Sequence, residues 1–204
     1  MSTPTAKQPF WKAVGLPAPH TPMSLDDYLQ LPETTVSMER LGGVVVYPHW
    51  NEVHMTPAPT PIHQDVVLRI GAWLLAYSRE AGGSAHIAPV DVVLPGGDVV
   101  QPDVMWLAPD SRCVRMEKRF RGVPELVIEV ISPGSAGYDR SDKYALYKRS
   151  GVGEYWIVDP VHQTVEVWTL VEGVFERQDA YRLSDTFTSV TLDVAVGVNT
   201  LLLG

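Results

Sequence analysis

The chain is poor in features that mark several common classes of protein. It has a single cysteine, Cys113, so no disulfide can form within it, which agrees with a reducing compartment. No run reaches the roughly 18 apolar residues that a membrane helix needs, and the N-terminus lacks the charged-then-apolar pattern of a secretion signal. We therefore expect a cytoplasmic protein without a membrane segment.

Signals for several catalytic chemistries are also missing. There is no Walker-type or dinucleotide-binding glycine motif, and Cys113 has no evident base partner. Five of the six histidines (residues 20, 49, 54, 86 and 162) show no spacing typical of zinc sites.

Positive charge is scarce overall but clustered. The 16 Lys+Arg against 24 Asp+Glu give a net charge of −8, which argues against tight nonspecific binding to DNA. One short segment nevertheless holds Arg112, Arg115, Lys118, Arg119 and Arg121, and a later one holds Arg140, Lys143, Lys148 and Arg149. The clusters are compatible with a solvated cationic surface and with a face that contacts DNA.

Composition predicts one compact domain preceded by an arm. The 204 residues are 45% hydrophobic, enough to bury a core. Residues 1–22 contain five prolines and no periodicity, so we interpret them as a flexible or surface-hugging arm with Phe10 and Trp11 as anchors. Residues 23–204 form the single domain.

Capping and periodicity predict a mixed sheet flanked by helices. Ser24 caps a short helix, and Thr60 caps a long helix that begins with Pro61 and ends at Gly82. Further patterns predict strands at 44–47, near 85–94, around positions 103 and 129 and at 154–159, a helix near 138–149, and antiparallel strands from 164 onward. The predicted class is α/β (α+β), with extra antiparallel strands.

Two acids lie in apolar, strand-like sequence. They are Asp103 in Val-Val-Gln-Pro-Asp-Val-Met-Trp-Leu and Glu129 in Glu-Leu-Val-Ile-Glu-Val-Ile-Ser. A buried carboxylate is costly unless a cation, a hydrogen-bond network or a raised pKa compensates it. Glu125 shares the strand face of Glu129 but lies roughly 13 Å away along the strand, too far to grip the same ion.

Carboxylate and carbonyl oxygens are the ligands that Mg²⁺ and Mn²⁺ prefer. Part of the coordination shell of such an ion would therefore come from Asp103, Glu129 and the main-chain carbonyl of Val130. Water and a phosphate oxygen would complete the shell. The alternative for each acid is a salt bridge, a cap or a solvated strand end.

Lys143 is a candidate partner for these acids. Leu146 and Tyr147 follow it on the expected helix and should be buried, so the face that carries Lys143 should point at least partly inward. An ammonium there can orient water and stabilise charge that develops on a phosphate. The alternative is an ordinary helix pair with Asp139, worth about 0.3–0.5 kcal/mol.

Five segments occur in an order that resembles a known family. They are Thr60-Pro-Ile-His-Gln, Val-Gln-Pro-Asp-Val, Glu-Leu-Val-Ile-Glu-Val-Ile-Ser-Pro-Gly-Ser, Asp139-x-x-x-Lys143-x-x-x-Tyr147 and Gly151-Val-x-Glu-Tyr-Trp-Ile-Val-Asp-Pro160. Together they resemble the Uma-two family of restriction endonucleases, within the PD-(D/E)XK nuclease superfamily, over roughly residues 24–170.

The resemblance implies a restriction-endonuclease-like fold and a Mg²⁺-dependent nuclease site. Asp103 and Glu129 match the metal-binding acids of the family. Lys143 matches a lysine that has moved from the strand to the next helix, because Ile131 occupies the usual lysine position.

The resemblance also assigns residues outside these two strands. His63 and Gln64 match a His-Gln pair on the first long helix, although a hydrogen-bonded, half-buried histidine is an alternative for His63. Glu39 aligns with an acid before the first strand, which can bind a second metal or its water. The family's second acid is absent here, and its turn is Gly42-Gly43, which weakens the assignment of Glu39.

These observations predict an endonuclease that hydrolyses DNA phosphodiester bonds by attack of an activated water, with Mg²⁺ or Mn²⁺. The alternative is a catalytically inactive nucleic-acid-binding or interaction module of the same fold, favoured by the altered Glu39 region and the acidic charge. A third interpretation treats the acids as structural hydrogen-bond acceptors. A homodimer is expected by analogy with the fold, and the sequence is compatible with single- or double-stranded substrates and with RNA.

Overall fold

The computed structural model describes residues 9–34, 36–48, 60–132 and 136–204. Its central six-stranded sheet contains, in spatial order, β12 (Val174–Arg182), β11 (Thr164–Val171), β10 (Glu154–Asp159), β9 (Leu126–Val130), β6 (Val104–Leu107) and β3 (Ser84–Ile87). The second six-stranded sheet contains β2 (Val44–Val46), β1 (Glu39–Leu41), β5 (Val99–Val100), β4 (Val92–Val93), β8 (Phe120–Arg121) and β7 (Val114–Arg115). A separate hairpin pairs β13 (Thr186–Ser189) with β14 (Val194–Gly197).

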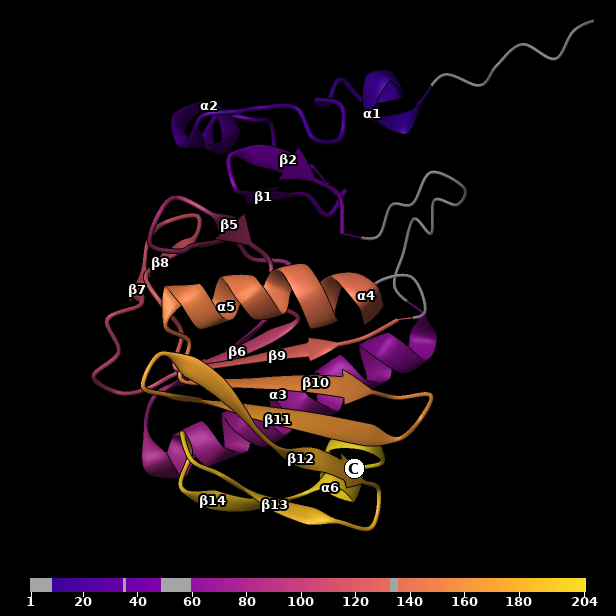
Figure 1. The fold of residues 1–204 in the computed structure, drawn as a ribbon, viewed down its shortest axis with the longest axis vertical. Coiled ribbons are helices and arrows are strands. Elements are labelled where there is room, and N and C mark those ends of the chain that lie inside the picture. The colour runs from indigo at the N-terminus through magenta and orange to yellow at the C-terminus, as the bar shows by residue number, and fades with distance from the viewer. Residues whose placement is uncertain (1–8, 35, 49–59, 133–135) are drawn as a thin grey trace, which may run out of the picture.

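Helices lie on both faces of the central sheet, as Figure 1 shows: α3 (Pro61–Ala81) and α6 (Val198–Leu202) pack on one face, and α5 (Tyr144–Ser150) packs on the other, after α4 (Ala136–Tyr138) and the π-helix η1 (Asp139–Lys143). The short helices α1 (Phe10–Ala13) and α2 (Leu25–Leu29) lie instead beside the second sheet. In the central sheet β9 and β10 are parallel, and the other neighbouring strands are antiparallel. The predicted mixed sheet flanked by helices is therefore confirmed.

Strand β9 is buried on both faces of the central sheet. Leu126, Ile128 and Val130 pack into the core beneath α3 and α6, whereas Val127 and Ile131 pack into the core beneath α5 and the second sheet. This is the two-residue alternation expected of a strand. It explains why the sequence around β9 reads as an almost continuous apolar run.

The predicted helix starts are confirmed. The hydroxyl of Ser24 accepts a hydrogen bond from the N–H of Asp27, and that of Thr60 accepts one from the N–H of His63. The strand predicted near 85–94 is instead two strands in different sheets, β3 and β4. Pairing of β3 with the central sheet ends at Ala88, whose N–H donates to the carbonyl of Asp103, and Pro89 has no N–H to continue it.

The described part of the expected arm contacts a third core cluster. Phe10 and Trp11 are partly buried against it, and the ring of Phe10 meets that of Tyr47 edge-on at 5.2 Å. Leu16 is buried in the same cluster. Residues 1–8, and most of the predicted loop at 48–61, lie outside the described residues. Within the described ranges, no helix is long and apolar enough to cross a membrane.

Asp159 closes the turn after β10 and gives a pH-dependent contribution to stability. Its carboxylate accepts hydrogen bonds from the N–H groups of Val161 and His162 at 3.0 and 2.9 Å. Burial alone would raise the pKa of Asp159, but these bonds and the His162 ring hold it below the ordinary value. A lowered folded pKa stabilises the fold above the ordinary aspartate range, and this stabilisation is lost as pH falls through the folded value.

We therefore expect Asp159→Asn to destabilise the protein at neutral pH by about 1 kcal/mol. The difference from wild type should shrink at pH values below the ordinary aspartate range, where wild type also loses the charge. Urea unfolding at several pH values measures it, and a difference that does not change with pH would contradict the assignment.

Candidate functional site

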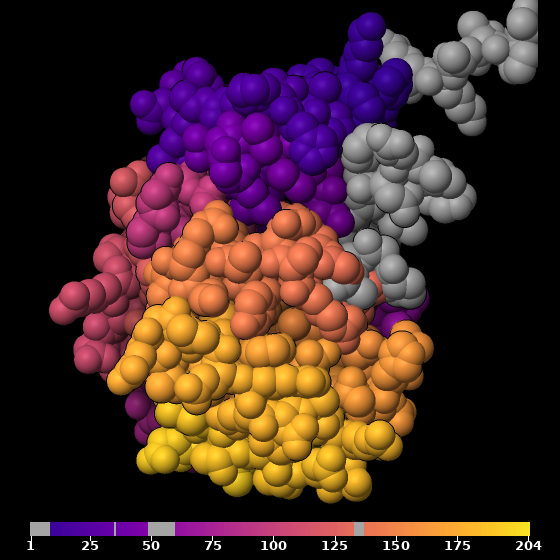
Figure 2. All heavy atoms as spheres, viewed as in Figure 1, coloured from indigo at the N-terminus to yellow at the C-terminus, as the bar shows by residue number. Residues whose placement is uncertain are grey.

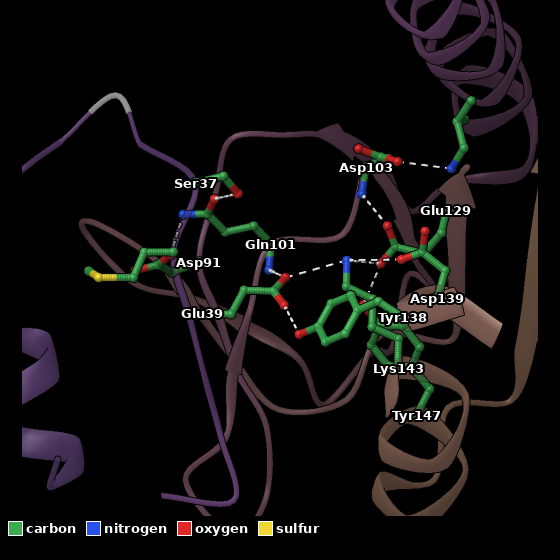
Figure 3. Close-up of polar contacts among 12 residues, drawn as sticks. Ser37, Glu39, Asp91, Gln101, Asp103, Glu129, Tyr138, Asp139, Lys143 and Tyr147 are labelled. Atoms are coloured by element: carbon green, nitrogen blue, oxygen red, sulfur yellow. Dashed lines mark hydrogen bonds and ion pairs between the residues drawn. The ribbon is translucent and has the colours of Figure 1, made fainter. Parts of the chain in front are cut away.

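Two neighbouring strands bring the predicted acids together. Asp103 directly precedes β6, and Glu129 lies in β9. The register pairs Val104 with Ile128, so it places Asp103 opposite Glu129. The N–H of Asp103 lies 3.4 Å from Oε2 of Glu129, as Figure 3 shows.

Pro102 ends the strand ladder at this point. The same register would place Pro102 opposite Val130, and Pro102 has no N–H to donate to the Val130 carbonyl. The N–H of Val130 instead donates to Oδ2 of Asp103 at 2.9 Å. The Val130 N–H thus holds the Asp103 carboxylate against β9, and Pro102 leaves the Val130 carbonyl without its usual strand partner.

Lys143 reaches the acids from the helical segment above the sheet. Its Nζ lies 2.9 Å from Oε1 of Glu129, 3.4 Å from Oε1 of Glu39 and 3.8 Å from Oδ1 of Asp139. The lysine side chain is only 5% exposed, and Leu146 and Tyr147 are fully buried. The predicted inward face of this helix is therefore confirmed, and the Asp139 pair is one part of a larger cluster.

A π-helical segment carries both Asp139 and Lys143. Single π turns inside helices occur frequently at functional sites, because they widen the turn and redirect side chains. Here the hydroxyl of Tyr155, from the sheet below, donates to the carbonyl of Asp139 at 3.1 Å. The sequence predicted a helix over this segment but gave no signal for the wider turn.

Two tyrosines complete the cluster, and sequence reasoning gave neither a role in the site. The hydroxyl of Tyr147 donates to Oε1 of Glu129 at 2.7 Å, and that of Tyr138 donates to Oε2 of Glu39 at 2.6 Å. The Nζ of Lys143 also lies 5.7 Å from the centre of the Tyr138 ring. The position of Tyr147, one helical turn after Lys143, was the available signal.

Glu39 joins the site from the second sheet. The sequence predicted that Glu39 precedes the first strand. Glu39 is instead the first residue of β1, because Glu39–Leu41 pairs with Val44–Val46 in a hairpin around the Gly42-Gly43 turn. Its Oε1 accepts the N–H of Gln101 at 2.9 Å. The side chain of Gln101 donates in turn to Asp91 at 2.9 Å, and neither of these two residues was singled out from the sequence.

His63 and Gln64, adjacent at the start of α3, lie in different surroundings. Nε2 of His63 lies 3.1 Å from Oδ2 of Asp103, and its ring is buried. Its Nδ1 is also buried and has no hydrogen-bond partner among the described residues. Gln64 is exposed, and no hydrogen bond between described residues joins its side chain to the acids.

The electrostatics of the site reflect an excess of acids. Burial raises the pKa of Glu129 well above its ordinary value, and neighbouring carboxylates raise it further against the opposing effect of Lys143. Burial would lower the pKa of Lys143, but Glu129, Glu39 and Asp139 raise it well above the ordinary value. The lysine therefore keeps its charge, and one cation is shared among several carboxylates.

His63 stabilises the ionised form of Asp103, the other acid of the site. Burial alone would raise the pKa of Asp103, but the hydrogen bond and charge of His63 hold it below the ordinary value. Burial would lower the pKa of His63, yet Asp103 raises it, with smaller contributions from Asp139 and the Val130 main chain. The ring thus lies beside both Asp103 and Val130.

The donor chemistry of these residues fits a hard divalent cation. Asp103 and Glu129 supply carboxylate oxygens, and Val130 supplies a carbonyl that Pro102 leaves unpaired in the ladder. The Nδ1 of His63, which has no hydrogen-bond partner among the described residues, is on a ring that contacts Asp103. In the described ranges no group of three or more His, Cys, Asp or Glu side chains is placed to hold a metal ion, so a metal held by the two acids would also need carbonyl, water or substrate oxygens.

Comparisons with known proteins concern the family and the fold of the chain. The family model described as "Uma2: Putative restriction endonuclease" matches residues 25–198. A crystal structure described as a putative nuclease belonging to DUF820 from Anabaena variabilis ATCC 29413 has 19% sequence identity and a TM-score of 0.70. The match covers 89% of this chain and 98% of that one, and it shows the shared fold. No curated protein matches the chain.

Proposed function

The chain belongs to the Uma2 family, and from that premise we propose that it is an endonuclease that hydrolyses DNA phosphodiester bonds with Mg²⁺ or Mn²⁺ and an activated water. The observation that supports this most is the sharing of one buried cation, Lys143, among three carboxylates, with Asp103 opposite one of them. Such a cluster is short of positive charge, and a divalent ion would supply it.

The two strand acids would hold the metal. Asp103, Glu129 and the carbonyl of Val130 are its proposed ligands. When bound, the metal would polarise the phosphate and lower the pKa of the attacking water. His63 acts on Asp103, which it keeps ionised and oriented through the 3.1 Å contact.

Lys143 acts through its charge. A pKa well above the ordinary value keeps the amine protonated, so Lys143 cannot act as a general base and instead orients water and offsets charge on the phosphate. Glu39 is a positioning residue in this proposal, because its carboxylate contacts Lys143, Tyr138 and the Gln101 N–H. Gln64 is free to contact the substrate from the exposed start of α3.

The direct test is cleavage by the purified protein. Supercoiled plasmid and labelled oligonucleotides are incubated with Mg²⁺ or Mn²⁺, with a chelator in a parallel reaction. We expect cleavage that requires the metal, stops with chelator and returns when excess metal is added. Absence of cleavage across metals, salt concentrations and both substrates would overturn the enzyme assignment.

A catalytically inactive nucleic-acid-binding module is the second candidate. The absence of a ready-made ligand group among the described residues favours it, as does the net charge of −8. This candidate predicts oligonucleotide binding that neither Mn²⁺ nor the strand acids influence. Titration of Mn²⁺ followed by electron paramagnetic resonance separates the two, because only the enzyme should bind the ion.

A homodimer working in the cytoplasm is part of the same proposal. Two copies related by a two-fold axis would present one site to each strand of a duplex. Light scattering of the protein with and without duplex DNA tests this, and a monomer that cuts both strands at one position would contradict it.

A further inference from the structure

The β7–β8 hairpin carries a concentration of positive charge that the site does not use. Residues 112–121 contain five of the chain's 16 Lys+Arg and only one of its 24 Asp+Glu. The segment is therefore strongly cationic in a chain whose net charge is −8. It projects from the edge of the molecule at the left of Figures 1 and 2.

The hairpin directs these charges outward. Four of its five cations are exposed, namely Arg112, Arg115, Lys118 and Arg121, and Arg119 is half-buried. Strand β7 is the edge strand of the second sheet, and both of its residues are exposed. Phe120 is buried in the core, so it holds in place the hairpin that carries the exposed cations.

Most of these charges are also unneutralised. Lys118 pairs with Glu33 at 3.4 Å, but both side chains are largely exposed, so the pair is weak. In the described part of the chain no ion pair joins Arg112, Arg115 or Arg121 to an acid, whereas the charge of the half-buried Arg119 opposes the rise that burial causes in the pKa of Asp91. The second cationic cluster differs, because Lys143 is buried, Arg140 pairs with Glu166 at 2.8 Å and Arg149 pairs with Asp98 at 2.7 Å. Of the two segments, only the hairpin presents a cluster of uncompensated arginines.

We infer that the β7–β8 hairpin is an anchoring surface for the phosphate backbone of a nucleic acid polymer. Arginines bind phosphate oxygens through paired N–H groups, and phosphate contacts supply most nonspecific affinity. The cationic β7–β8 hairpin would offset the repulsion between the phosphate backbone and the acidic remainder of the chain. The inference rests on the proposed function only for the chemical class of the partner.

The position of the hairpin sets the size of that partner. Strand β8 ends at Arg121, four residues lie between it and the start of β9 at Leu126, and the hairpin lies at the end of the molecule where β9 begins, as Figure 1 shows. Glu129 is three residues further along β9, so these three strand steps alone add about 10 Å, or about three base-pair steps of B-DNA. A ligand that contacts both the hairpin and the acids would therefore extend over several nucleotides.

The test measures binding without cleavage. Fluorescence anisotropy follows a labelled 20-base-pair duplex and a 20-nucleotide single strand in the presence of a chelator, over a series of salt concentrations. The variant is Arg112→Gln/Arg115→Gln/Arg121→Gln. The control is Lys12→Gln/Arg79→Gln/Arg182→Gln, which removes the same charge from exposed positions elsewhere.

We expect the hairpin variant to bind both probes at least tenfold more weakly than the control. The slope of log K against log salt should fall by roughly 0.7–0.9 for each phosphate that the variant no longer neutralises. Equal binding by hairpin variant and control would overturn the inference, and so would a wild type that binds neither probe. Because no metal is present, an inactive enzyme can still support the hairpin assignment, and an active one can still refute it.

Discussion

Replacement of Glu129 by glutamine is expected to abolish divalent-cation binding and to reduce cleavage more than about 100-fold. Loss of a residue that only hydrogen-bonds a metal ligand already lowers metal affinity or activity about 10–100-fold, and loss of a ligand should cost more. The fold should survive the change. Glutamine keeps an oxygen in the place that accepts from Lys143 and Tyr147, at 2.9 and 2.7 Å in the native protein. What disappears is the negative charge that the proposed metal requires.

The metal-free stability of Glu129→Gln should match or exceed that of wild type. Burial and nearby carboxylates raise the pKa of Glu129 in the folded state. For an acid whose folded pKa is raised, ionisation destabilises the fold as pH rises from the ordinary glutamate range through the folded value. Glutamine cannot ionise, so its advantage in melting temperature should grow over that range.

Asp103→Asn is the matched control, because it should lose cleavage but shift stability in the opposite direction. Its folded pKa is lowered through His63, so ionised Asp103 stabilises the native state. Melting temperatures without metal, and cleavage and Mn²⁺ binding with it, separate the two effects. If Glu129→Gln cut DNA as wild type does, the interpretation of the acids as structural acceptors would prevail.

The sequence predicted the strand part of the site well because short-range rules determine it. Alternation along β9 places Glu129 on the face that carries Val127 and Ile131, and Pro102 predicts a strand start beside Asp103. The inward face of the helix after β9 followed from the spacing of Lys143, Leu146 and Tyr147. Each of these inferences needed only the period of one element.

The sequence predicted less where separate elements meet. The hydrogen bonds from Gln101 and Tyr138 to Glu39 join residues 62 and 99 positions apart. No periodicity within one element can reveal such contacts, because they depend on how the second sheet packs against the central one. The same reason explains why the prediction of one strand near 85–94 was wrong, since its two halves belong to different sheets.

Replacement of Lys143 by methionine is expected to have the largest effect on stability. It would leave Glu129, Glu39 and Asp139 buried without their shared cation, and breaking a buried ion pair typically costs about 3–5 kcal/mol. Cleavage should fall about 10²–10³-fold, the range for loss of one group that stabilises developing charge. Urea unfolding and single-turnover cleavage measure the two losses.

Arg149→Met is the control for Lys143→Met. Arg149 also forms an ion pair, with Asp98 at 2.7 Å, but its side chain is 52% exposed. Loss of such a pair should cost no more than about 1 kcal/mol and should leave cleavage unchanged. Equal stability losses for the two variants would contradict the view that Lys143 compensates a buried cluster of acids.

Two additions should rescue Lys143→Met if charge compensation is its structural role. Mn²⁺ should raise the melting temperature of Lys143→Met more than that of wild type, because it supplies positive charge to Glu129, the carboxylate that the lysine and the proposed metal share. Adding Glu129→Gln should recover part of the lost stability, since one fewer acid then lacks a partner. The two substitutions would thus be non-additive, as expected for groups in direct contact. Strict additivity would mean that the lysine stabilises the fold through its packing, and that the acids are neutralised by another route.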